Sequence, residues 1–151
     1  MADGSEKILI REMREEDLPA IVEIERTSFS LPWSETSFRK ELHKTRPLSR
    51  VALLNDTVVG YVCAECVADE GHILNLAVRP DYRQKCIATT LVETSIEEMK
   101  LRACRFVYLE VRASNYAAKR LYQSFGFRVV GIRKKYYVLP IEDAVIMMLQ
   151  I

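Results

Sequence analysis

The sequence predicts an α/β protein built on one mixed sheet with helices on both faces. Strand-forming segments and amphipathic helical segments alternate along the chain. The strand-forming segments are spaced as hairpins near both ends, whereas a helix-length segment separates the two strands in the middle. The 151 residues, of which 49% are hydrophobic, have the size and composition of one domain with one substantial core. We therefore expect residues 1–151 to form a single domain.

The first third of the chain is expected to contain one strand and two helices. Residues 7–13 have the composition of a strand, and residues 15–29 carry apolar side chains at helical spacing. Pro19 falls in the first turn of that helix, where its missing N–H costs nothing. Ser34 is a good N-cap for a short second helix, which ends before Pro47.

The middle of the chain predicts a hairpin, a further strand and a crossover helix. Residues 50–54 and 57–68 flank an Asn-Asp turn at hairpin spacing, and residues 72–78 form the next strand. Over residues 86–102, apolar side chains recur every three or four positions, as in a helix that buries one stripe. We expect this crossover to join two parallel strands.

The last third predicts a strand, a helix and a final hairpin. Residues 106–112 are rich in β-branched and aromatic side chains, and residues 115–125 form a helix closed by Gly126 as its C′ residue. Residues 127–138 and 143–150 complete the chain as two strands. The whole order predicts a central, mostly antiparallel sheet of about seven strands with about four helices.

The charge balance excludes a strong electrostatic attraction to nucleic acid or to an anionic membrane. The chain carries 22 Lys and Arg against 21 Asp and Glu, a net charge of +1, so any anion site must be local. No apolar run is long enough for a signal peptide or a membrane span. We therefore expect a cytoplasmic protein, most simply a monomer, that binds neither nucleic acid nor membranes directly.

The four cysteines predict core packing rather than metal or redox chemistry. Cys63 and Cys66 form a CxxC, but they lie in an extended apolar segment where positions three apart face opposite sides of a strand. A second CxxC is absent, and neither histidine stands at ligand spacing. We expect no metal site, and reduced thiols.

The candidate site lies where two strands deliver their carboxyl ends into helices. Open α/β sheets bind ligands at such ends. Glu110 lies within an apolar strand, so its carboxylate must be paired, protonated or functional. Tyr122 lies among apolar residues of the next helix, where core packing with its hydroxyl tied to the backbone is one explanation. The residues alone leave both alternatives open.

The other strand end brings a basic turn that runs straight into the crossover helix. Residues 79–85 contain Arg79, Arg83 and Lys85, and a helix N-terminus behind such a turn suits an anion such as a phosphate. Phosphate-binding loops usually place a glycine where the backbone approaches the ligand, and here that position is Cys86. We expect Cys86 to have helical φ and ψ, since it opens the helix.

Four segments together resemble the GNAT N-acetyltransferases. "AVRPDYRQKCIA" is similar to that superfamily's acetyl-CoA loop, usually written Q/R-x-x-G-x-G/A, and departs from it at the cysteine. "YLEVRASNYAAKRLYQSFGF" is similar to its strand–helix unit in the form typical of bacterial ribosomal-protein-alanine N-acetyltransferases, the RimI type. "ILIREMREEDLPAIVEIERTSFSLPWS" and "RKKYYVLPIEDAVIMML" resemble the same subfamily, so the likeness covers nearly the whole chain.

This resemblance implies a GNAT-like fold and an acetyl-CoA-dependent protein N-terminal acetyltransferase. The implied acceptor is the N-terminal alanine of a small-subunit ribosomal protein. By the same resemblance, Glu110 corresponds to the general base and Tyr122 to the general acid. The implied cofactor-binding residues are Leu76, Ala77, Val78, Arg83, Gln84, Lys85, Cys86, Ile87, Ala88 and Asn115. The implied residues for the acceptor are Trp33, Tyr136 and Tyr137.

Two alternatives remain open from the sequence. One is the same chemistry on other protein N-termini or on a small amine; the basic residues Arg133, Lys134 and Lys135 of the last hairpin disfavour a polyamine. The other is a non-catalytic acyl-CoA-binding module that lost its activity with the loop glycine. The presence of both Glu110 and Tyr122 argues against it.

Overall fold

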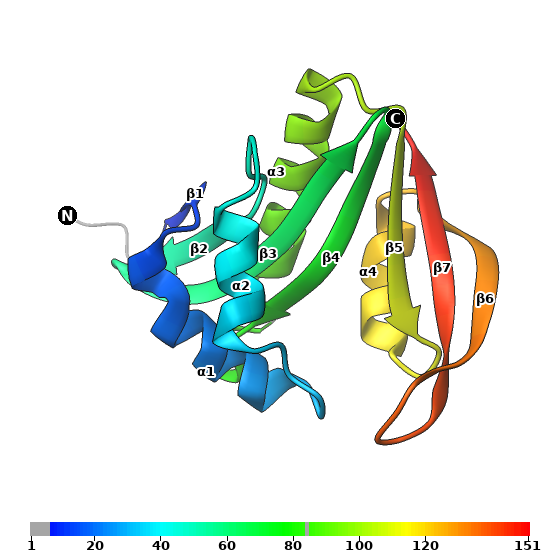
Figure 1. Cartoon of the computed structure of the whole chain (residues 1–151), viewed down its shortest axis with the longest axis horizontal. Helices are drawn as coiled ribbons and strands as arrows, with labels where there is room; N and C mark the ends of the chain where they lie inside the picture. The colour runs from blue at the N-terminus through cyan, green and yellow to red at the C-terminus, as the bar shows by residue number, and fades with distance from the viewer. Residues whose placement is uncertain (1–6, 84) are drawn as a thin grey trace.

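The computed structural model describes residues 7–83 and 85–151, which build a seven-stranded sheet in the order β1-β2-β3-β4-β5-β7-β6 (Figure 1). The strands are β1 (Ile8–Glu12), β2 (Arg50–Leu54), β3 (Thr57–Val67), β4 (Glu70–Val78), β5 (Phe106–Arg112), β6 (Arg128–Tyr137) and β7 (Glu142–Gln150). The helices are α1 (Leu18–Ser28), α2 (Glu35–Leu42), α3 (Ile87–Leu101) and α4 (Tyr116–Ser124).

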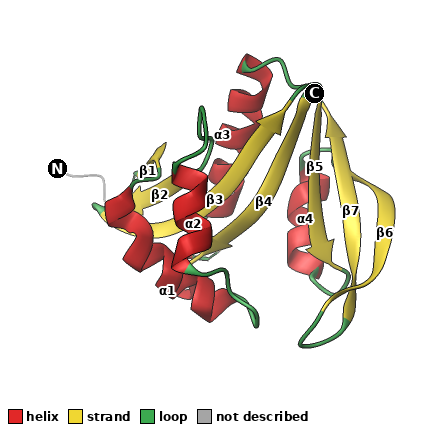
Figure 2. Ribbon diagram, viewed as in Figure 1, coloured by secondary structure: helices red, strands yellow, loops and turns green. Residues whose placement is uncertain are grey.

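Helices cover both faces of the sheet, as the sequence predicts (Figures 1 and 2). Helices α1 and α2 bury Leu18 and Phe38 against Tyr61 of β3 in one core cluster. Helices α3 and α4 lie on the opposite face, where Leu91 and Tyr122 belong to a second cluster. Each helix therefore buries one apolar stripe and leaves its other side to solvent.

The predicted topology is confirmed. Strands β4 and β5 pair in parallel through the α3 crossover, and the other neighbouring strands pair antiparallel. Two of the elements start more than one residue away from the predicted position. Helix α1 begins at Leu18 after a 3-10 turn, Glu15–Asp17. Strand β4 begins at Glu70 rather than residue 72, because its first residues pair with both β3 and β5.

A β-bulge in β4 opens the sheet. Cys63 of β3 pairs with Asn75 whereas Ala64 pairs with Ile73, so Leu74 is an extra residue in β4. Bulges bend a strand and increase its twist. The parallel pairing with β5 ends at Ile73, and beyond it the two strands diverge (Figure 1). The carboxyl ends of β4 and β5 are thus separated where a ligand can enter.

The cysteines are free thiols, and the CxxC pair lies on opposite faces as expected. Cys63 belongs to the cluster beneath α1, whereas Cys66 packs against the other cluster. There the Sγ of Cys66 lies 3.1 Å from the Sγ of Cys104. Within residues 7–83 and 85–151, no three His, Cys, Asp or Glu side chains are grouped to hold a metal ion. No helix in these ranges is long and apolar enough to cross a membrane.

Candidate active site

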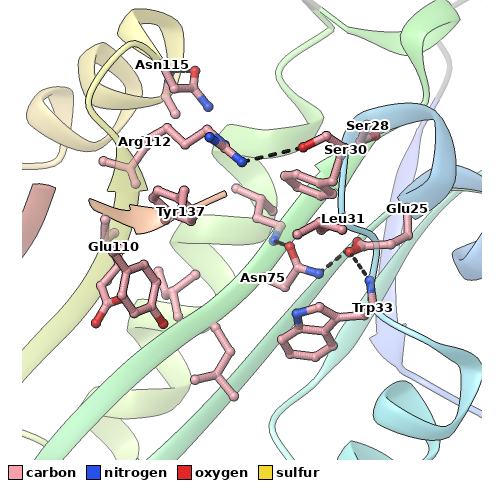
Figure 3. Close-up of a pocket in the computed structure, with 18 of the residues that line it drawn as sticks. Glu25, Ser28, Ser30, Leu31, Trp33, Asn75, Glu110, Arg112, Asn115 and Tyr137 are labelled. Atoms are coloured by element: carbon pink, nitrogen blue, oxygen red, sulfur yellow. Dashed lines mark hydrogen bonds between the residues drawn. The ribbon is translucent and has the colours of Figure 1, made fainter. Parts of the chain in front are cut away.

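A cleft of about 570 Å³ occupies the opening between β4 and β5 (Figure 3). Its walls come from the end of α1, the α1–α2 loop, β4, β5, α4 and the β6–β7 hairpin. The predicted site residues that line it are Trp33, Leu76, Glu110, Asn115, Tyr122, Tyr136 and Tyr137. The fold therefore brings together residues that are up to about a hundred positions apart in sequence.

Glu110 occupies a cleft-facing position of β5. Its neighbours Leu109 and Val111 are buried on the other side of the strand, as the sequence alternation predicts. The Glu110 side chain is 28% exposed, and its Oε1 lies 3.4 Å from Nε of Arg133 on β6. The negative charge of Glu110 also raises the pKa of Tyr136. The carboxylate is therefore accessible from the cleft and forms an ion pair with the exposed Arg133.

Tyr122 projects from α4 into the same cleft. The residue is 7% exposed, and its ring packs edge-on against Phe127, with the ring centroids 5.6 Å apart. No residue in the described part of the chain hydrogen-bonds its hydroxyl, so the alternative of a hydroxyl tied to the backbone is not what the structure shows. Burial raises the pKa of Tyr122, which keeps the phenol protonated.

The β6–β7 hairpin is fixed beside the end of β5 by Arg112. The Arg112 guanidinium lies over the Tyr137 ring, 4.5 Å from its centroid, and donates to the carbonyl oxygens of Val138 and Pro140 at 3.0 Å each. Tyr136 packs edge-on against Tyr137. Burial and, next, the charge of Glu110 raise the pKa of Tyr137 to about 12. Both tyrosines are therefore neutral phenols at the cleft wall.

Trp33 stands on the opposite wall, in the loop between α1 and α2. Its ring packs on Phe38, with the centroids 5.3 Å apart. Its backbone N–H donates to Oε2 of Glu25 at 2.8 Å. The predicted N-cap Ser34 is confirmed, since its hydroxyl accepts from the N–H of Ser37 and so fixes where α2 begins.

Glu25 is a site residue that the sequence interpretation overlooked. It lies at a helical spacing within the apolar stripe of α1, is 1% exposed, and forms part of the cleft wall. Its Oε1 accepts from the Tyr61 hydroxyl. The same oxygen accepts from Nδ2 of Asn75 (Figure 3). A glutamate at a core position of an amphipathic helix was the available signal in the sequence.

The turn between β4 and α3 corrects one expectation. Cys86 has φ 61° and ψ 18°, so it is left-handed and not helical. The chain arrives extended at Arg83 and must reverse before Ile87, whose buried side chain anchors the first helical turn. A left-handed residue makes that reversal, at an expected cost of about 1–2 kcal/mol for a non-glycine. In this chain, the position where the family has a glycine therefore has positive φ.

The predicted cofactor-binding residues from Ala77 to Ala88 that the structure describes are not among the residues that line the cleft. Ala77 and Val78 are buried, and Ala88 is half-buried. Nε of Arg83 donates to the carbonyl of Val78 at 3.2 Å, which holds the turn against the end of β4. Lys85 is exposed, and its ammonium lies over the Tyr82 ring.

One predicted cofactor residue, Gln84, lies outside the described residues. Another, Asn115, is the N-cap of α4. Its Oδ1 accepts from the N–H of Ala118 at 3.1 Å. By contrast, no side chain in the described ranges caps the N-terminus of α3. The N–H groups of that helix end are thus available to an anion.

Comparisons with known proteins identify the family and agree with the fold. Residues 18–127 match the model of the acetyltransferase (GNAT) family. The chain is 39% identical over 142 residues to a protein of Bacillus subtilis strain 168 named putative ribosomal protein bS18-alanine N-acetyltransferase, covering 93% of this chain and 94% of that one. The crystal structure of the ribosomal-protein-S18-alanine N-acetyltransferase from Escherichia coli has a TM-score of 0.90 and 37% identity, covering 96% and 94% of the two chains.

A solved structure with a peptide and CoA is also similar. A chain of the NatC complex bound to Gag peptide and CoA has a TM-score of 0.86 and 27% identity, covering 96% of this chain and 99% of that one. These similarities extend over nearly the whole chain, including the two strand ends that flank the cleft.

Proposed function

Because the chain belongs to the acetyltransferase (GNAT) family, we propose that it transfers an acetyl group from acetyl-CoA to the N-terminal alanine of a small-subunit ribosomal protein. The observation that carries the proposal is the convergence of Glu110 and Tyr122 on one cleft, at the divergence of β4 and β5. The names of the relatives from B. subtilis and E. coli support the ribosomal acceptor.

Glu110 is the proposed general base. Direct attack on a thioester requires a neutral amine. At pH 7 an α-amine with a pKa of about 8 is roughly a tenth neutral, whereas a lysine side chain near 10.4 is less than a thousandth neutral. This difference corresponds to about 3 kcal/mol, so an N-terminal amine requires less of the base. The accessible carboxylate on β5 is well placed to accept the amine's proton.

The backbone of β4 is the proposed binding strand for the acetyl group and the pantetheine arm. The Leu76 N–H is taken by Oδ1 of Asn75 at 3.0 Å, and the Arg79 N–H bonds to β3. Since alternate N–H groups of a strand point to the same side, Val78 presents its N–H on the same side as Leu76, toward the opening. We propose the Val78 N–H as the donor to the oxyanion of the tetrahedral intermediate.

Tyr122 is the proposed general acid for the departing thiolate. Burial makes its phenol a weaker acid than free tyrosine, whereas the conjugate thiol has a pKa near 8.5. Proton transfer from this phenol to the free thiolate would therefore run uphill. We therefore propose that the proton moves in concert with cleavage of the C–S bond.

The α3 turn is the proposed site for the CoA pyrophosphate. The N–H groups of residues 83–88 and the positive end of α3 would bind the anion through the backbone. Cysteine has that N–H as glycine does, so the Cys86 substitution keeps the donor. Trp33 on one wall and Tyr136 and Tyr137 on the other are the proposed aromatic contacts for a small first residue of the acceptor.

Release of free CoA thiol from acetyl-CoA tests the proposal. Peptides that differ only in their first residue would be compared with the same peptide already acetylated, and with a polyamine. The alanine peptide should be the fastest substrate, and the blocked peptide should give no release above background. Turnover of the polyamine without turnover of any peptide would overturn the proposed acceptor, and binding of acetyl-CoA without any turnover would favour a non-catalytic module.

A further inference from the structure

Glu25 links two segments on one side of the cleft, the α1–α2 loop and β4, to the core. It belongs to α1, and its three donors come from three other segments: Trp33 in the α1–α2 loop, Tyr61 in β3 and Asn75 at the bulge of β4. Each carboxylate oxygen has at least one donor. Both oxygens of this carboxylate in the cleft wall therefore accept hydrogen bonds; those from Asn75 and Trp33 are drawn in Figure 3.

This arrangement is unfavourable for stability alone. A buried carboxylate loses its hydration, and the partners of Glu25 in the described chain are neutral groups rather than cations. A well-packed apolar side chain at this position of α1 would avoid the desolvation penalty. Burial and the charge of Glu25 raise the pKa of Tyr61, so its hydroxyl keeps the proton that it donates.

The bonds of Glu25 fix two parts of the proposed site relative to each other. Oε2 of Glu25 accepts from the backbone N–H of Trp33, whose side chain is proposed to contact the acceptor. Oε1 of Glu25 accepts from Nδ2 of Asn75 and so orients that side chain. Oδ1 of Asn75 in turn accepts from the N–H of Leu76 in β4, the strand proposed to bind the pantetheine arm. A continuous series of hydrogen bonds thus runs from the backbone of Trp33 to β4.

We propose that Glu25 is a positioning residue for acceptor binding, which holds Trp33 at a fixed distance from β4. This inference rests on the proposed function, because the acceptor is taken to be a peptide N-terminus that contacts the Trp33 wall. Glu25 itself does not exchange a proton with substrate. Loss of the Glu25 carboxylate lets the α1–α2 loop move, so the acceptor binds more weakly. Binding of acetyl-CoA is retained.

The decisive variant is Glu25→Gln. A glutamine oxygen can still accept from Tyr61 and Asn75, but its NH₂ group then faces the N–H of Trp33, and two donors cannot bond. We expect the KM for an alanine-initiated peptide to rise about tenfold. The kcat and the Kd for acetyl-CoA should stay within about threefold, because the Asn75 side of the series is kept.

Trp33 provides a readout that does not depend on activity. It is the single tryptophan of the chain, so intrinsic fluorescence reports on this loop alone. In Glu25→Gln, acrylamide should quench Trp33 about twice as effectively as in the wild type, because the loop is released. Unchanged quenching together with an unchanged peptide KM would overturn the inference.

Tyr61→Phe is the matched control. It removes a donor from the same carboxylate and keeps the ring that packs edge-on against Phe38, but it leaves the bond between Glu25 and Trp33. Its Tm should fall, because the carboxylate loses a partner. Its peptide KM and its Trp33 quenching should match the wild type. If Tyr61→Phe reproduced both effects of Glu25→Gln, a general loss of stability would explain them and the positioning role would be refuted.

Two further outcomes are separable. If wild-type protein releases no thiol with any peptide, the proposed function fails, whereas the quenching comparison still tests the hold of Glu25 on Trp33. If Glu25→Gln does not fold, as judged by circular dichroism, Glu25→Asp replaces it. That variant keeps the charge but withdraws the carboxylate by one methylene, and the same rise in KM and quenching is expected.

Discussion

The two strand-to-helix turns at the cleft differ in how their helices begin. The turn from β5 to α4 is held by side chains: Asn115 caps α4, and Oε2 of Glu142 accepts from the N–H of Ser114 at 2.5 Å. The turn from β4 to α3 has no such cap in the described chain and reverses through a left-handed, exposed Cys86.

This difference separates two tasks. A side-chain cap satisfies one of the free N–H groups at a helix start and so stabilises that end, as the Asn115 side chain does for the Ala118 N–H of α4. An uncapped end keeps its N–H groups for a ligand and relies on that ligand for their partners. We therefore propose that the β5–α4 turn supports the residues of the chemical step and that the β4–α3 turn binds the cofactor. Changes at the first should affect kcat, and changes at the second should affect affinity.

The largest expected effect is on kcat, from changes to Glu110 and Tyr122 beside the β5–α4 turn. Glu110→Gln and Tyr122→Phe should each lower kcat by about 100-fold or more, because each removes a proton acceptor or donor from the reacting groups. The Kd for acetyl-CoA, measured by calorimetry, should change by less than about twofold. Unchanged turnover in both variants would remove the assignment of chemistry to this side.

The next largest effect is on the affinity for acetyl-CoA, from changes in the β4–α3 turn. Cys86→Asp places a carboxylate beside the open N–H groups of α3, where it competes with the pyrophosphate and repels it. The KM for acetyl-CoA should rise about tenfold, which corresponds to about 1.4 kcal/mol, with kcat nearly retained. Cys86→Asn adds a polar side chain without charge and serves as the control. Equal affinity in Cys86→Asp and the wild type would show that the pyrophosphate binds elsewhere.

A smaller effect tests the conformation of the turn itself. Cys86→Gly should relieve about 1–2 kcal/mol of left-handed strain, offset in part by the greater freedom of glycine in the unfolded chain. The expected gain is a rise in Tm of about 1–4 °C, with acetyl-CoA affinity changed by less than about tenfold. Cys86→Ala retains the Cβ and should give no gain. A Cys86→Gly protein as stable as Cys86→Ala would contradict positive φ at this residue.

The smallest effect concerns the pH dependence of the β5–α4 turn. Hydrogen bonds from Ser114 and the nearby Arg112 guanidinium hold the pKa of Glu142 below its ordinary value of 4.5. Its stabilising contribution is therefore present above the unfolded pKa and is lost as the pH falls through the lower folded pKa. Between about pH 6 and about pH 3, the Tm of Glu142→Gln should therefore fall by less than the Tm of the wild type. Parallel curves for the two proteins would show that Glu142 does not stabilise this turn.

Local pattern predicted most of the fold because neighbouring residues determine periodicity. The strand Phe106–Arg112 was predicted to the residue, since alternation sets both its limits and the face of Glu110. The family resemblance supplied the site residues that line the cleft. The left-handed turn at Cys86 was predicted wrongly, because its φ depends on the direction in which the buried Ile87 anchors α3.

The role of Glu25 could not be predicted from periodicity at all. Its donors lie 8, 36 and 50 positions away, and they meet only when α1 packs on β3 and β4. The start of β4 was missed for a similar reason, because pairing partners on two other strands extend it. Contacts of this kind are properties of the assembled sheet and leave little local trace.

The short parallel seam between β4 and β5 has a practical consequence for protein engineering. In the sheet, the β1–β4 unit joins the β5–β7 unit along four pairs, from Glu70 with Phe106 to Ile73 with Leu109. A cut at the exposed Ala103, in the connection between α3 and β5, would divide the chain at this seam. Trp33 would then lie on one fragment and Glu110 on the other, so acetyl transfer would report that two separately expressed fragments had reassembled.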